Sequence, residues 1–252
     1  MNGIKILFFS ILVLFFSGCI PKQEDVKDAF QSNSATIIKN DYKKIQKYLI
    51  TFKEKLDKRN PNSYSKDLSP RIYRLINELE NDFLLKFKKS TLSNYKDYLQ
   101  IAFSKDNIHS RNDYLVLGLY YLMHDSYNIS DGHKIMAFAY DKDRLDKLHK
   151  NLQILKWKIK VDKDAYGNYL FLTWQNNWQI ELSKKIEDNE IIPYKKISEL
   201  KFIKENKESI LGPSNFSFEV LLTQMITNVE NSLTALGEEP KELTIKAMFL
   251  FL

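Results

Sequence analysis

Apolar residues recur every three or four positions through much of this 252-residue chain, and this spacing constrains the fold more than any other feature. Such spacing places apolar side chains on one face of an α-helix. The first long stripe comprises Ile37, Ile38, Ile45, Tyr48, Leu49, Phe52 and Leu56. The last comprises Phe218, Leu221, Leu222, Met225, Ile226, Val229, Leu233 and Leu236, and Gly237 with Pro240 just beyond predicts the end of this helix. The pattern predicts a mainly α, multi-helix globular domain.

Between these stripes the sequence predicts further helices. Residues 72–87 and 92–103 each read as an amphipathic helix, and Asp141 begins another. Residues 114–123 are apolar on nearly every side, so we expect a buried central helix there. Gly118 lies in its middle, where glycine costs about 1 kcal/mol relative to alanine. A close approach of a second helix would explain this glycine.

One segment, residues 156–174, departs from the helical pattern. Trp157, Ile159 and Val161 alternate with lysines, Gly167-Asn168 supplies turn residues, and residues 169–174 are rich in aromatic and β-branched types. This pattern predicts a small β-hairpin at about 156–174. The whole chain holds only seven glycines and six prolines, too few for the many turns of a β-sandwich of this size.

The N-terminus has the layout of a secretory signal. Lys5 precedes the apolar run Ile6–Phe16, and the small residues Ser17 and Gly18 lead to Cys19. The run is shorter than the roughly 20 apolar residues that span a bilayer. Cys19 is the only cysteine, which excludes an intramolecular disulfide.

The motif Phe16-Ser17-Gly18-Cys19 resembles the lipobox of bacterial lipoproteins, although leucine is more usual where Phe16 stands. The resemblance implies that residues 1–18 are a cleaved signal peptide and that Cys19 carries acyl chains such as palmitate. Residues 19–35 would then be the lipidated cysteine with a tether, and residues 36–252 a single α-helical domain. The alternative is a free or buried cysteine behind an ordinary signal peptide or anchor.

This resemblance also implies a location. A lipoprotein is anchored to a membrane on its extracytoplasmic side, which in a Gram-negative cell is the periplasmic side. Ile20 follows the cysteine where aspartate would affect sorting, and this favours the outer membrane. Two or three acyl chains make a stable anchor, because each buried CH₂ contributes about 0.8 kcal/mol.

The net charge of +6 does not point to nucleic acid. Lysine greatly outnumbers arginine, whereas nucleic-acid interfaces rely on arginines directed at phosphates and bases. An exported protein also seldom meets nucleic acid. We therefore expect no nucleic-acid partner and interpret the lysines as the solvated faces of helices.

Catalytic and metal-binding patterns are weak. His124, Asp125 and His133 lie within ten residues, but the chain contains no His-Glu-x-x-His motif and no cysteine pair. It also contains no Gly-x-Ser-x-Gly elbow and no phosphate-binding glycine loop. We therefore predict no enzyme, no cofactor and no metal, with His124 and His133 as weak metal candidates. An envelope hydrolase that uses these three residues is the least favoured alternative.

The segment 174–179 (WQNNWQ) places Trp174 and Trp178 four residues apart on one helix face, beside Asn177 and other amides. Indole rings stack on sugars and amides bind hydroxyls, so a module for cell-wall glycan such as peptidoglycan is one alternative. The other interpretation is that both indoles anchor the helix in the core. The favoured function is non-catalytic: an envelope protein that binds a protein partner or scaffolds an assembly.

Overall fold

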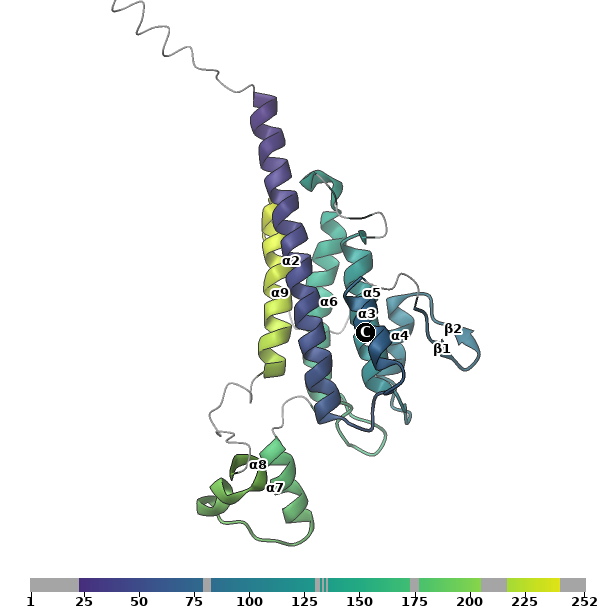
Figure 1. Ribbon diagram of the computed structural model, residues 1–252, viewed down its shortest axis with the longest axis vertical. Helices are drawn as coiled ribbons and strands as arrows, with labels where there is room; N and C mark the ends of the chain where they lie inside the picture. Colours follow the sequence, from purple (N-terminus) through teal and green to yellow (C-terminus); the bar gives the residue numbers. More distant parts are fainter. Residues whose placement is uncertain are drawn as a thin grey trace, which may run out of the picture.

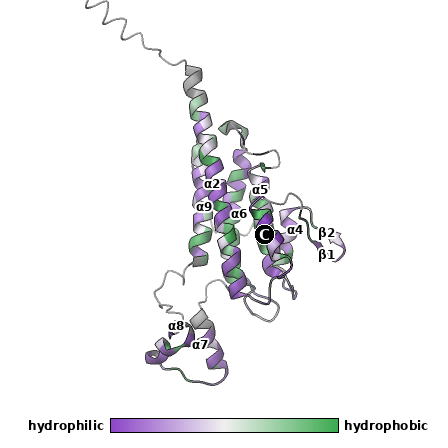
Figure 2. Cartoon of the chain, in the orientation of Figure 1, coloured by the Kyte–Doolittle hydropathy of each residue, from purple (hydrophilic) through white to green (hydrophobic). Residues whose placement is uncertain are grey.

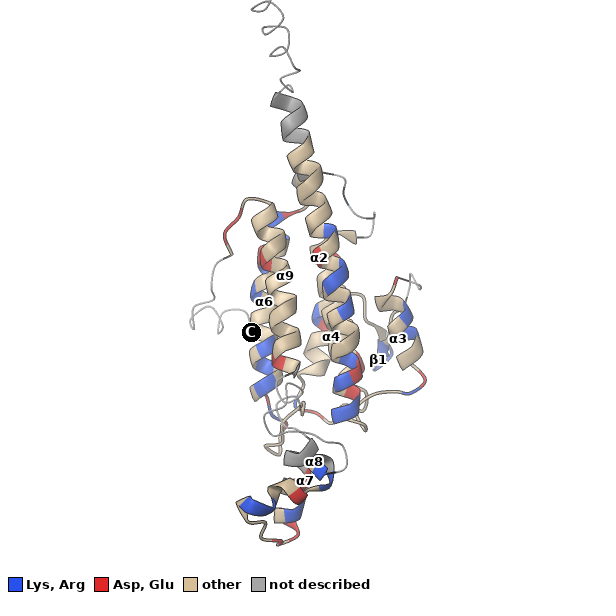
Figure 3. Ribbon diagram, turned by 60° about the vertical axis from the view of Figure 1, so that its left-hand side comes forward, with Lys and Arg blue, Asp and Glu red and all other residues tan. Residues whose placement is uncertain are grey.

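The computed structural model describes residues 23–78, 83–129, 132, 134, 136–172, 177–204 and 217–240. Its core is a bundle of long helices, and Figure 1 shows α2 (Gln23–Arg59) and α9 (Ser217–Ala235) side by side. Helix α6 (Lys142–Val161) packs against α9, and α4 (Tyr95–Ala102) packs against α5 (Arg111–Ser126). The mainly α prediction is confirmed. Along these helices apolar and polar residues intermingle (Figure 2), and lysines and arginines recur along α2 and α6 (Figure 3).

Helix α2 packs against α9 and buries most of the predicted stripe, whereas Ile37 is 46 % exposed. The rings of Phe52 and Phe218 meet edge to face at a centroid distance of 5.7 Å. The helix begins earlier than expected: residues 23–35, which the sequence analysis assigned to a tether, are helical. No glycine or proline, the two residue types least compatible with a helix interior, interrupts residues 23–59.

The predicted helix over residues 72–87 is much shorter in the structure. Helix α3 spans Ser69–Ile76 with Asn77 as its C-cap, and the backbone of Glu78 is left-handed with φ at 60°. Strands β1 (Lys86–Phe87) and β2 (Ser90–Thr91) then form an antiparallel hairpin. At its tip Lys88 and Lys89 both have positive φ, of 46° and 74°, as a tight two-residue hairpin turn requires.

The small antiparallel hairpin expected in the fold therefore exists, but its predicted position at 156–174 is wrong. Helix α6 continues to Val161, and only an isolated bridge joins Lys163 to Tyr169. Leu148, Leu152, Leu155 and Ile159 are buried at helical spacing. This stripe outweighs the local alternation with lysines, because burial of a continuous face stabilises the helix.

The central helix α5 confirms both sequence expectations for residues 114–123. Leu115, Val116, Leu117 and Leu119 are fully buried. A Cβ atom on Gly118 would lie 2.6 Å from Leu99 Cδ2 of α4. The glycine thus permits the close packing of α4 on α5.

The chain leaves α9 as predicted. Gly237 has a φ of 78°, and the Glu238 N–H donates to the Leu233 carbonyl at 3.0 Å, which is a Schellman cap. A 3₁₀ helix, η2 (Ala137–Ala139), packs on α2. The sequence of residues 241–252 also predicts a helix, but these residues lie outside the described part of the chain.

Helix α7 (Asn177–Glu187), the 3₁₀ helix η3 (Tyr194–Glu199) and α8 (Lys201–Lys204) form a smaller group beyond one end of the bundle (Figure 1). The Lys201 N–H donates to the Glu181 carboxylate at 2.8 Å and joins α8 to α7. Whether residues 36–252 behave as one domain stays a prediction. In the described part of the chain, no helix combines the length and apolar character needed to cross a membrane.

Candidate functional site

Most residues singled out by sequence fall where the structure gives no side-chain geometry. Cys19, His133 and Trp174 lie outside the described residues. Asn177 and Trp178 are the first residues of α7, but their side chains are not described. Lipidation at Cys19 and glycan binding through these tryptophans therefore stay predictions.

The structure describes both His124 and Asp125, and their side chains contact different residues. His124 lies in the last turn of α5, partly buried, with its ring centroid 5.7 Å from that of Tyr120. Burial lowers the pKa of its imidazole, an effect that the acidic groups of Glu78 and Asp125 oppose. The Asp125 carboxylate pairs instead with Arg144 of α6 at 3.4 Å. Among the described residues no group of three or more histidine, cysteine, aspartate or glutamate side chains could hold a metal ion.

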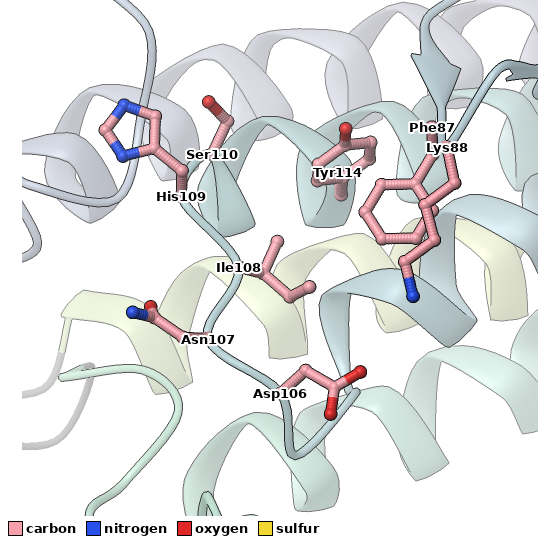
Figure 4. A pocket seen from close by; sticks show the side chains of 8 residues that line it. All are labelled: Phe87, Lys88, Asp106, Asn107, Ile108, His109, Ser110 and Tyr114. Carbon is pink, nitrogen blue, oxygen red and sulfur yellow. The ribbon is translucent and has the colours of Figure 1, made fainter.

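A pocket of about 580 Å³ opens between the β-hairpin and the loop before α5 (Figure 4). Phe87 and Tyr114 form one wall, with their ring centroids 6.0 Å apart. His109 and Ser110 line the opposite side, and in Figure 4 the imidazole lies well apart from Lys88 and Asp106. No hydrogen bond joins His109 to Ser110 or Asp106 within the described part of the chain. The pocket therefore lacks an oriented pair of nucleophile and base.

A buried ionic cluster, which the sequence reading missed, joins α2 to α5. The Lys53 side chain is fully buried, and its ammonium donates to Asp57 Oδ2 at 2.7 Å and to Asp113 Oδ1 at 3.0 Å. The rings of Tyr64 and Tyr73 lie 5.5 and 5.6 Å from the same nitrogen.

The surrounding polar groups complete this cluster. The Ser65 N–H donates to Asp113 Oδ2 at 2.7 Å, and the Asn112 amide donates to Asp57 Oδ1 at 3.0 Å. Burial raises the pKa of the Asp113 carboxyl, while the Lys53 charge opposes the shift. Because these charges are buried, a ligand in solution cannot reach them, and we interpret the cluster as a structural link that holds α2 against α5. Its sequence signal was a lysine four residues after Leu49, on the apolar stripe.

A groove of about 860 Å³ lies between α4 and α6 and is called here the α4–α6 groove. Its lining residues are Tyr95, Lys96, Leu99, Gln100, Phe103, Lys147, Asn151, Ile154, Leu155 and Lys158. Volumes of roughly 300–1,000 Å³, mainly apolar with a few polar groups, are typical of small-molecule sites. The groove is therefore a candidate binding site, and sequence reasoning missed it because its two walls are distant in the chain.

Comparison with known proteins gives no outside guide to the site: no protein-family model, no curated protein and no solved structure matches the chain.

Proposed function

We propose that this chain is a lipid-anchored protein of the bacterial cell envelope whose helical bundle binds a protein partner rather than catalysing a reaction. The observation that carries the proposal is the order Lys5, Ile6–Phe16 and Ser17-Gly18-Cys19 at the N-terminus. In such a lipoprotein Cys19 would carry a diacylglyceryl group on its thiol and a further acyl chain on the α-amine that cleavage frees. Two or more acyl chains on it would give stable membrane attachment.

The geometry of α2 is compatible with such an anchor. The helix begins four residues after Cys19 and spans 37 residues, which corresponds to about 55 Å at 1.5 Å per residue. Burial against the bundle starts at Ala35, and residues 29–34 are exposed or partly exposed. The first turns of α2 would therefore act as a stiff spacer between a lipidated Cys19 and the bundle.

The described surface also supports a binding role more than a catalytic one. The hairpin pocket holds no oriented nucleophile and base, and the buried charges of Lys53 and Asp113 are enclosed. Trp157 of α6 is 39 % exposed and Val220 of α9 is 47 % exposed, so both helices carry large apolar side chains on their surface. Tryptophan in particular is enriched among the residues that dominate binding at protein–protein interfaces.

Intact-mass analysis of membrane-extracted protein tests the anchor, with wild type compared with Cys19→Ala and a Ser34→Ala control. We expect wild type and the control to begin at Cys19 and to carry a diacylglycerol-plus-acyl mass that Cys19→Ala lacks. An unmodified Cys19 in the wild type would refute the anchor. A photo-crosslinker at Trp157 then tests the partner, because its crosslinks should disappear in the Cys19→Ala background.

A further inference from the structure

We propose that the α4–α6 groove is a binding site for a single-chain anionic amphiphile of the fatty-acid class. This goes beyond the proposed function and does not rest on lipidation of Cys19. The proposal rests on three properties of the groove: an apolar floor, a cationic rim and an uneven distribution of charge between its two ends.

The floor of the groove is apolar, and it is deep because α4 packs closely on α5 beneath it. Ile154 and Leu155 of α6 are each 5 % exposed, and Leu99 of α4 lies against Gly118. The missing Cβ of Gly118 lets Leu99 sink toward α5. The partly exposed side chains of Leu99 and Phe103 leave apolar surface whose burial under an apolar ligand is favourable.

The rim of the groove is positively charged, and no acidic residue lines the groove. Lys96, Lys147 and Lys158 all line the groove, and no aspartate or glutamate does. Lys96 and Lys147 are exposed, and within the described ranges neither forms an ion pair. The amides of Gln100 and Asn151 add uncharged donors. This rim is complementary to an anion.

The two ends of the groove differ in whether their lysines are paired with an acidic residue. Lys158 Nζ lies 4.9 Å from the Phe103 ring and pairs with Asp162 at 2.7 Å, so its charge is already compensated. Phe103 follows the last residue of α4, and Lys158 is close to the end of α6. Lys96 and Lys147 belong to the beginnings of the same helices, so they share the opposite end.

This polarity fits a ligand with one head and one tail. The uncompensated ammonium groups of Lys96 and Lys147 would hold a carboxylate at one end. An alkyl chain would then run over Leu99 and Leu155 toward Phe103. The distance along α6 from Lys147 to Lys158 is about 16 Å at 1.5 Å per residue. An ion without a chain would leave the floor uncovered, and a neutral chain would leave the ammonium groups unpaired.

Equilibrium dialysis with radiolabelled laurate tests the proposal on the full chain in phosphatidylcholine nanodiscs, corrected for laurate in empty nanodiscs. The test variant is Lys96→Ala with Lys147→Ala. The matched control is Lys39→Ala with Lys43→Ala, two exposed lysines of α2 whose removal changes the net charge equally. All four side chains are exposed, so both variants should fold.

We expect saturable binding of one laurate per chain in wild type and control. Binding should be about tenfold or more weaker in the groove variant, because two charge-assisted contacts are lost. Unlabelled laurate should displace the label, whereas dodecanol and acetate should not. Absence of binding above empty nanodiscs, equal binding in both double variants, or displacement by dodecanol would each overturn the proposal. Binding of a Glu- and Leu-rich amphipathic peptide in place of laurate would also overturn it and assign the groove to a protein partner.

Discussion

Removing the cation from the buried cluster tests whether it holds α2 against α5. In Lys53→Met an apolar side chain of similar length replaces an ammonium that lies 2.7 Å from Asp57 and 3.0 Å from Asp113. The two carboxylates then stay buried without their counter-charge, although Ser65 and Asn112 still donate to them. Leaving a buried charge unpaired in this way costs about 3–5 kcal/mol.

This loss can be measured by thermal unfolding of the full-length chain in a mild detergent. At roughly 2–4 °C per kcal/mol, the melting temperature should fall by about 6–20 °C. The matched control is Lys142→Met, which breaks an ion pair to Glu238 whose side chains are 48 % and 49 % exposed. Such a surface pair contributes at most about 1 kcal/mol.

The loss should also depend on pH. Burial already raises the pKa of Asp113, and Lys53 opposes that shift, so the pKa should rise further in Lys53→Met. A carboxyl with a raised folded-state pKa loses stabilisation as pH rises through that pKa, so the variant's deficit should be smaller at about pH 5 than at about pH 7. Adding Asp57→Asn and Asp113→Asn should recover part of the loss. A deficit below about 1 kcal/mol, or one unchanged by these additions, would refute the reasoning.

Gly118→Ala should lower the free energy of unfolding by about 1 kcal/mol in urea titrations, because the clash with Leu99 exceeds the gain in helix propensity. In a Leu99→Ala background the same change should stabilise the protein, and a stabilised single variant would contradict the close packing. The His124 ring should titrate below pH 6.5 in NMR spectra assigned with His124→Gln, since burial lowers its pKa; a midpoint above 6.5 would contradict this. Asp41 has a pKa raised by burial above 3.8, so its contribution to stability is lost as pH rises through that pKa. Asp41→Asn should therefore lose less stability than wild type between about pH 4 and pH 7 in unfolding titrations, and parallel curves would contradict the raised pKa.

The sequence predicted a helix most accurately where a repeated apolar stripe was followed by a residue that ends helices. The stripe from Phe218 to Leu233 and the stop at Gly237 located α9, because burial of one face and a left-handed cap act locally. Gly118 predicted a close helix contact for the same kind of reason. Its partner Leu99 could not be named, since tertiary packing chooses it.

Local sequence patterns predicted the wrong secondary structure where tertiary packing or an unusual turn determined the conformation. The alternation around Trp157 and Ile159 indicated a strand, yet the buried face of α6 kept this segment helical. The real hairpin has Lys88 and Lys89 at its tip, and lysine is an unusual residue at positions with positive φ, so no turn signal marked it.

The candidate site was beyond sequence reasoning for a different reason. Lys96 and Lys147 resemble ordinary solvated lysines in the sequence, and only the packing of α4 and α6 onto α5 brings them to one groove.

The pairing of α2 with α9 joins the first and the last described helices of the chain, so the bundle can close only after α9 has been synthesised. During synthesis the apolar stripe of α2 emerges first, and its cover begins only at Ser217, after the residues that follow Arg59 have been added. At roughly 5–20 residues per second this interval lasts about ten to thirty seconds. Throughout this interval Phe52 lacks its native partner Phe218, so part of the apolar face of α2 stays uncovered until the last described helix is complete.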